Sequence, residues 1–222
     1  MVSITQYKET RPAISGQPKR KMISSVALML VLLSLFFSVG AQEKKFNYKI
    51  SIHGKSVGEL SVRQKSSSDS LILDINSSIS TRMIFLFTAI AAEKTIFKNG
   101  RLKYSYISRQ INKGSQTTME TKDMGSVYHS QKKGEDIRVN PAPIYHNMSS
   151  LYLVEPLNFQ TVYSDMFQDF VKIIFLKTHN YKIILPDGNY NEYYYENGIC
   201  KQIKVHHSLF TAQMDLISIK QL

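Results

Sequence analysis

Acidic and basic side chains that could cooperate in catalysis lie in or beside one proline-rich segment. Asp165, Asp169 and His146 accompany the stretch "NPAPIYHNMSSLYLVEP", residues 140–156, where a loop could cover a cleft. Such residues fit a hydrolase that acts on a polysaccharide or an ester. Acids near turns are far more often surface residues than catalytic ones, so this hypothesis ranks below the two that follow from the strand pattern.

Histidine and cysteine do not indicate a metal site. His206 and His207 are adjacent, and adjacent residues of a strand point to opposite faces, so they cannot chelate one ion. The other histidines are scattered, and the sequence has no zinc-protease motif, Gly-rich phosphate loop or GxSxG elbow. Cys200 is the single cysteine, so no internal disulfide can form and a small strand residue is expected there. We therefore predict no catalytic set, no metal and no cofactor.

Three consecutive tyrosines stand out in "PDGNYNEYYYENGICKQIKVHH", residues 186–207. Turn sequences flank Asn191–Glu196, which predicts a short strand. Tyr193 and Tyr195 then share one face, and Tyr194 lies on the other.

Two interpretations of Tyr193 and Tyr195 remain open. They can be core aromatics that pair across the sheet with Ile203 and Val205 of the next strand. They can also form an aromatic wall of a ligand cavity.

The elements that would position these residues are strands. Residues 42–222 are poor in alanine and rich in β-branched and aromatic residues, and they alternate apolar with polar residues between frequent turn signals. A period of two places one face in a core and the other in water. The residues predicted to face inward include Phe46, Tyr48, Ile50, Ile52, Leu60, Val62, Leu71, Leu73, Ile75, Ile79, Leu102, Tyr104 and Tyr106.

Two segments depart from this pattern. Met83–Ala92 is almost continuously apolar, and we expect two strands with a bend near Ala89. Ser149–Val154 follows two prolines and precedes Pro156, so one or two helical turns are expected there. The predicted fold class is all-β: a single antiparallel sheet curled into an open or closed barrel, with one short helical insertion.

The N-terminal region has the parts of an export signal. Lys19–Lys21 supply cations, Val26–Phe37 an apolar core, and Val39 and Ala41 small residues for cleavage. We expect residues 1–41 to be a signal peptide with an N-terminal extension, and residues 42–222 to form one domain in the periplasm or outside the cell. An uncleaved anchor is the alternative, although the apolar run of 17 residues is shorter than the roughly 20 that span a bilayer. Met22 is an alternative start.

The charge of the chain restricts its partners. The net charge is +11, and without residues 1–41 the chain keeps 23 basic and 16 acidic residues, a net charge of +7. These cations are spread along the sequence, whereas nucleic-acid binding requires clusters on one element. We therefore expect no nucleic acid, and membrane contact that is at most peripheral, through attraction to anionic surfaces.

Three stretches carry a resemblance to a known group of proteins: "YKISIHGKSVGELSV", "IFKNGRLKYSY" and "YKIILPDGNYNEYYYENGICKQIKV". Their order resembles an uncharacterised family of exported Bacteroidota β-rich proteins, a domain of unknown function that is similar in pattern to open-barrel envelope protein families. The matching residues are turns and strands, so the resemblance implies fold and export and transfers no active site.

The strand pattern leads to two function hypotheses. The first is a non-enzymatic envelope module that binds a lipid or other amphipathic small molecule inside the curled sheet, lined by Tyr104, Tyr106, Tyr193 and Tyr195. The second is a structural or adaptor protein that offers sheet edges to an envelope protein. The envelope hydrolase is third, because catalysis requires convergent polar groups and no recognisable spacing of them is present.

Overall fold

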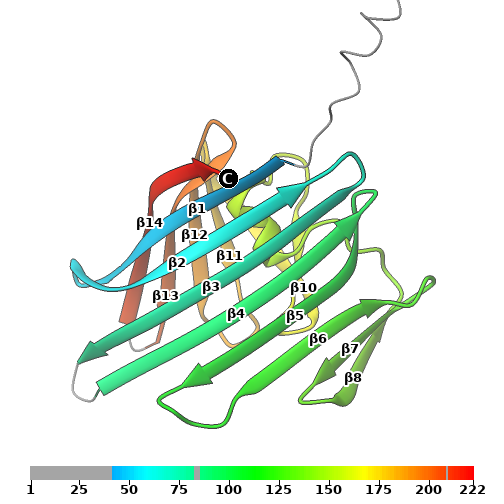
Figure 1. Ribbon diagram of the computed structural model, residues 1–222, viewed down its shortest axis with the longest axis horizontal. Helices are drawn as coiled ribbons and strands as arrows, with labels where there is room; N and C mark the ends of the chain where they lie inside the picture. The colour runs from blue at the N-terminus through cyan, green and yellow to red at the C-terminus, as the bar shows by residue number, and fades with distance from the viewer. Residues whose placement is uncertain (1–41, 83–85, 209) are drawn as a thin grey trace, which may run out of the picture. The chain divides into compact units, whose positions relative to one another are not determined.

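The computed structural model describes residues 42–82, 86–208 and 210–222, and the predicted signal peptide lies outside them. The described residues form one antiparallel sheet of 14 strands (Figure 1). Its strand order is β8-β7-β6-β5-β4-β3-β2-β1-β14-β13-β12-β11-β10-β9. The strands are β1 (Gln42–Ile52), β2 (Lys55–Ser66), β3 (Ser70–Arg82), β4 (Leu86–Lys98), β5 (Arg101–Ile111), β6 (Thr117–Asp123), β7 (Tyr128–Lys132), β8 (Glu135–Asn140), β9 (Thr161–Ser164), β10 (Asp169–Lys177), β11 (Asn180–Ile184), β12 (Tyr190–Glu196), β13 (Ile199–His207) and β14 (Phe210–Gln221).

The predicted alternation produces the core. In β1, Phe46, Tyr48, Ile50 and Ile52 are all buried, as expected for the inner face of a half-buried strand. Short turns reverse the chain between the long strands. Asn99 and Gly100, for example, both have positive φ, the backbone conformation that a two-residue hairpin requires.

The apolar segment after β3 differs from the prediction. β4 is one strand, and Ala89 lies within it without a bend. It pairs with β3 from Arg82 to Ser70 and with β5 from Ile111 to Arg101. A bend would break ladder hydrogen bonds on both sides, so the two neighbouring strands hold β4 straight. Residues 83–85, in the predicted first strand, lie outside the described residues.

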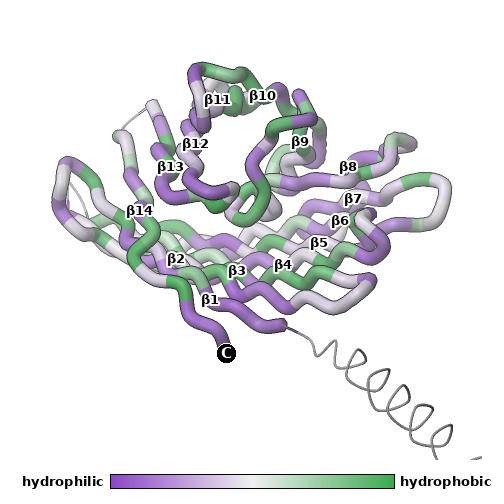
Figure 2. Tube along the Cα trace, turned by 90° about the horizontal axis from the view of Figure 1, so that it is seen from above, coloured by the Kyte–Doolittle hydropathy of each residue, from purple (hydrophilic) through white to green (hydrophobic). Residues whose placement is uncertain are grey.

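The sheet curls so that its two halves face each other. Pairing of β1 with β14 joins the N-terminal strands to the C-terminal ones, and β9–β12 arch over the concave side of β2–β6 (Figure 2). The edge strands β8 and β9 do not pair with each other, so the sheet is not closed. The prediction of a single curled antiparallel sheet is confirmed, and of its two alternatives the open form is observed.

Side chains bridge the gap between the two edges. The hydroxyl of Tyr163 on β9 is hydrogen-bonded to Ser130 on β7 at 2.9 Å and to Thr121 on β6 at 3.1 Å. Gln168, in the turn before β10, donates to the backbone carbonyls of Glu120 and Gln131. An ion pair joins Arg138 of β8 to Asp169 of β10. The barrel-like form thus depends on side chains where a closed barrel would use backbone pairing.

The predicted helical insertion lies between the two edge strands. Its regular part is the 3₁₀ helix η1 (Met148–Tyr152). Asn147 caps this helix, because its Oδ1 accepts a hydrogen bond from the Ser150 backbone N–H at 3.1 Å. Leu151 is fully buried, and its carbonyl accepts a hydrogen bond from the Tyr195 hydroxyl at 2.8 Å. The insertion is therefore packed into the interior of the curled sheet.

Candidate ligand pocket

A pocket of about 270 Å³ lies on the concave side of the sheet. It is bounded by β4 and β5 on one side, by β12–β14 and the turn between β11 and β12 on the other, and by η1 and the turn at residues 165–168. Its apolar lining consists of Ile107, Met148, Tyr152, Met166, Phe167, Leu185, Tyr193, Ile203, Val205 and Met214. Its polar lining consists of Glu93, Arg109, Ser149, Ser164, Asp165, Asp187, Asn189, Asn191 and His207. Apolar and polar residues line this pocket in similar numbers, so it can contact both an apolar and a polar part of a small molecule.

Asp165 is the most deeply buried acid of this pocket. Only 4% of the residue is exposed. Its Oδ2 accepts a 2.7 Å hydrogen bond from Asn147 Nδ2, which also donates to Thr95 Oγ1 of β4 at 3.2 Å. Its Oδ1 has no hydrogen-bond partner of normal geometry among the described residues, although the Ser105 hydroxyl lies close enough to affect its pKa.

Glu93 of β4 is a second acid in the same pocket. Its Oε2 accepts a 2.9 Å hydrogen bond from the Ser149 hydroxyl of η1. It lies deep in the interior, yet its side chain is partly accessible because it lines the pocket. Arg109 of β5 is exposed at the pocket and is near enough to interact electrostatically with Glu93.

Burial favours the neutral forms of both acids, and the charge of Glu93 adds to this effect at Asp165. Burial, together with the charge of Glu93, raises the pKa of Asp165 to about 7, although hydrogen bonding to Ser105 and Asn147 acts to lower it. Burial also raises the pKa of Glu93 above its ordinary value, against the lowering effect of Ser149 and Arg109. Two acids that disfavour each other's ionisation are typical of functional sites.

Asn191 of β12 provides another unpaired acceptor. Its Oδ1 is buried and has no hydrogen-bond partner among the described residues. Asn191 lines the pocket, as Asp165 does. Because buried polar atoms without partners are costly and uncommon in folded proteins, two of them at one pocket indicate a site adapted to hydrogen-bond donors.

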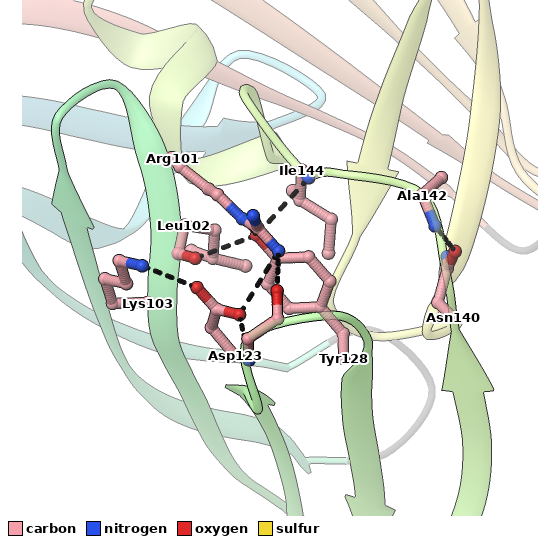
Figure 3. Close-up of polar contacts among 9 residues, drawn as sticks. Arg101, Leu102, Lys103, Asp123, Tyr128, Asn140, Ala142 and Ile144 are labelled. Carbon is pink, nitrogen blue, oxygen red and sulfur yellow. Dashed lines mark hydrogen bonds and ion pairs between the residues drawn. The ribbon is translucent and has the colours of Figure 1, made fainter.

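A second cluster of polar residues, around Tyr128, stabilises the fold (Figure 3). Arg101 donates to Tyr128 Oη at 2.9 Å and contacts Asp123 Oδ1 at 3.2 Å, and Lys103 contacts Asp123 Oδ2 at 2.6 Å. The Tyr128 hydroxyl donates to the Leu102 carbonyl and accepts from the Ile144 backbone N–H. Within the described chain, no buried side-chain polar atom of this cluster lacks a partner. It ties β5, β6 and β7 to the insertion and serves the fold.

The predicted ligand-binding residues Tyr193 and Tyr195 do share the inner face of β12. Tyr193 pairs with Ile203, as expected, and lines the pocket. Val205 pairs with Asn191, and Tyr195 pairs with Cys200 because the register shifts by one residue between Tyr194 and Tyr195, past Lys201. Tyr195 is fully buried beside η1 and does not line the pocket.

Tyr104 and Tyr106 do not face the pocket, contrary to the expected register. The pairing of β4 with β5 shifts by one residue after Leu102, so Leu102, Ser105 and Ile107 point inward and the two tyrosines point outward. A single bulged residue moves every later side chain to the other face. Burial and the nearby Glu120 raise the pKa of Tyr104 to about 12.

The residues considered for acid–base catalysis do not converge in one pocket. Asp165 lines the pocket described above, whereas His146 stacks on Phe159 and lines a separate hollow. Burial lowers the pKa of His146. Asp169 pairs with Arg138, and this partner outweighs burial and lowers the pKa of Asp169.

Among residues 42–82, 86–208 and 210–222, no three His, Cys, Asp or Glu side chains are placed to hold a metal ion. Cys200 is buried, and burial raises the pKa of its thiol.

Glu93 and Asn191 were not among the residues singled out from the sequence. A signal for Glu93 exists: it shares the inward parity of Thr95 and Phe97 in β4, and a charged residue at an inward position is unusual. Asn191 carries no comparable signal, because it stands beside a turn where asparagine is common.

The fold and the pocket define a class of all-β, barrel-like proteins whose single curled sheet remains open and surrounds an interior pocket. The chain belongs to the family described as domain of unknown function DUF6134, which matches residues 48–217. This agrees with the expected kinship to an uncharacterised β-rich family, and the Bacteroidota and envelope associations stay predictions.

A solved structure supports the same architecture. The chain is similar to the crystal structure of a beta-barrel-like protein of domain of unknown function DUF1849 from Brucella abortus, with a TM-score of 0.57 and 10% sequence identity. The similarity covers 83% of this chain and 100% of that chain. At this identity the likeness concerns the fold alone. A comparison with curated proteins found no match.

The described residues contain no helix of the length and apolarity that crossing a membrane would demand.

Proposed function

We propose that this protein is an exported, non-enzymatic module of the cell envelope that binds a lipid or another amphipathic small molecule in the pocket of its curled sheet. The observation that carries the proposal is the composition of the pocket. Apolar side chains come mainly from β5, η1, β12–β14 and the turn at residues 165–168, and polar side chains of β4, β5, η1, β9, β12, β13 and the adjacent turns lie among them. Such a lining matches a molecule with an apolar part and a polar end.

The export part of the proposal is supported by the sequence of residues 19–41. Its cations, apolar core and small residues are those of a signal peptide.

An apolar fluorescent dye tests the binding proposal. We expect Nile red to gain fluorescence with residues 42–222 and to be displaced by lipids. Val205→Trp should abolish the gain, because Val205 lines the pocket and a larger side chain would fill it. Lys204→Trp is the matched control, since Lys204 is the next residue of the same strand and does not line the pocket.

Circular dichroism of both variants checks that they fold, and Met148→Trp on η1 provides a second way to fill the pocket. Unchanged dye binding by folded Val205→Trp and Met148→Trp would contradict the proposal. So would the absence of any dye signal with the wild-type protein.

A second candidate function, an adaptor for another envelope protein, has one observation in its favour. Large apolar side chains are exposed on and beside β10 and β11, where Phe175 is 64% exposed. The others in this region are Leu157, Leu176 and Ile184. Exposed apolar groups that gather in one place can mark a protein contact.

A further inference from the structure

We propose that the polar end of the bound molecule is a primary ammonium group, received by Asp165 together with Glu93 and Asn191. The inference rests on the proposed function and adds the chemical class of the ligand: an amphipathic primary amine. It is argued from the hydrogen-bonding state of the three side chains, the charge of the lining and the position of the apolar residues.

The unpaired atoms at the pocket are acceptors. Asp165 Oδ1 and Asn191 Oδ1 are buried, line the same pocket and have no partner of normal geometry in the described part of the chain. Glu93 uses Oε2 to accept from Ser149. A ligand that satisfies these oxygens must bring N–H or O–H donors, and an ammonium group supplies three. A carboxylate or a phosphate would bring further acceptors and leave the oxygens unpaired.

The charge of the lining selects a cation over a neutral donor. Three carboxyl groups, those of Glu93, Asp165 and Asp187, line the pocket, against one permanent cation, Arg109. This acidic lining lies within a chain whose net charge is +11. A cation at these acids favours their ionised forms, which burial alone disfavours, and a hydrogen bond from an ammonium group to a carboxylate is stronger than one from a hydroxyl group.

A metal ion is a poorer occupant than an organic cation. Within the described residues no set of three His, Cys, Asp or Glu side chains is placed to hold one. The apolar residues Met166 and Phe167 follow Asp165 directly in the chain and line the same pocket. An ammonium group at Asp165 would therefore carry its apolar substituent directly into apolar surroundings.

Four ligands with the same octyl chain separate the contributions of tail, charge and donors. They are octylamine, octyltrimethylammonium, octanol and octanoate, each used to displace Nile red from the protein near neutral pH. We expect octylamine to displace the dye at a concentration lower than octanol or octyltrimethylammonium by about tenfold or more, as expected for charge-assisted hydrogen bonds. Octanoate should be the weakest of the four.

Variants assign the preference to the acids. Asp165→Asn and Glu93→Gln keep the size of each side chain and remove its charge, so we expect each to reduce the advantage of octylamine over octanol to about threefold or less. Octanol should displace the dye equally well from wild type and variants. Asp74→Asn, an acid of β3 that pairs with Lys94 and does not line the pocket, is the matched control and should keep the full preference.

The outcomes separate this inference from the proposed function. If the four ligands displace the dye equally, or if octyltrimethylammonium or octanol matches octylamine, the pocket binds apolar chains and the ammonium proposal is overturned while the function stands. If the dye does not bind wild-type protein, both fall. A preference for octylamine that survives in folded Asp165→Asn and Glu93→Gln also overturns the assignment.

Discussion

Asp165 combines deep burial, one strong hydrogen bond and one unpaired oxygen. This combination lowers the free energy of unfolding when its carboxyl group ionises. A carboxyl group that is buried beside a second acid, Glu93, is held mainly in its neutral form until the pH approaches about 7. In the unfolded chain it ionises near its ordinary pKa of 3.8. The folded protein therefore binds more protons than the unfolded chain between these two values.

The sign of the resulting pH dependence follows from this difference. The contribution of Asp165 to the free energy of unfolding is largest below the unfolded pKa, and it is lost as the pH rises through the folded pKa of about 7. At about 1.4 kcal/mol per pKa unit, the loss is of the order of a few kcal/mol. We expect Asp165→Asn to remove this loss, so that the variant gains stability relative to wild type as the pH rises from about 5 to about 8.

Urea unfolding of both proteins at the two pH values measures this effect. Asp74→Asn, whose carboxyl group lies on the surface beside Lys94, should show no comparable gain. A wild-type protein whose unfolding free energy varies with pH in the same way as that of Asp165→Asn would disprove the interpretation.

Residue-level patterns explain which predictions about side chains were right. Tyr193 and Tyr195 lie on one face because adjacent residues of a strand point to opposite faces, a rule that holds within any regular strand. The same rule gave the wrong face for Tyr104 and Tyr106, because the bulge after Leu102 interrupts the strand that carries them. Bulges depend on how two strands fit together and leave no dependable trace in one sequence.

At the scale of elements, Gly58 shows how closely neighbouring strands approach each other. Gly58 lies within β2 and pairs with Ile79 of β3. A Cβ atom at this position would be 2.0 Å from the backbone carbonyl oxygen of Ser78. Only glycine therefore allows β2 and β3 to pair here without displacement of the backbone.

We expect Gly58→Ala to lower the free energy of unfolding by about 1–3 kcal/mol, because the added methyl group meets backbone that cannot move aside without breaking the ladder. Chemical denaturation provides the measurement. Ser56→Ala, an exposed substitution in the same strand, should have little effect. Equal stabilities of the two variants would show that the strands separate without cost at Gly58.

The elements as a group were predictable to different degrees. Strands with regular alternation, such as β1 and β3, were located from the sequence with their buried residues. β4 was not, because its apolar run at residues 86–92 has no period that separates one strand from two. Its continuity is imposed by pairing with β3 along its whole length and with β5 from Ala89 to Lys98.

At the scale of the whole sheet, the pocket depends on how the two unpaired edges are held together. The edges at β8 and β9 do not pair, and the turn at residues 165–168 rests against β6 and β7 through Gln168, whose Nε2 lies 2.7 Å from the Gln131 carbonyl oxygen. This turn also carries Asp165, so the contact that bridges the two edges of the open sheet also places the acid in the pocket.

We expect Gln168→Ala to lower the free energy of unfolding by about 1–2 kcal/mol, as for the loss of partly buried hydrogen bonds. Amide hydrogen exchange should become faster in β9 and β10 and remain unchanged in β1–β3, which are far from the contact in the sheet order. Gln64→Ala removes a hydrogen bond within β2 only and should leave exchange in β9 and β10 unaltered. If amide hydrogen exchange became equally faster in all strands of Gln168→Ala, Gln168 would not act locally in holding the two sheet edges together.

The sequence by itself determined the all-β class, the single curled sheet, the short helical insertion and most of the buried positions, because these follow from local alternation and turn chemistry. Only the tertiary structure decided which polar residues meet in the pocket. These residues are far apart in the chain: Glu93 lies in β4, Asp165 in the turn that precedes β10, and Asn191 in β12. Their meeting depends on bulges, register and the curl that brings the two halves of the sheet face to face, and these are set by contacts between strands and by no single segment.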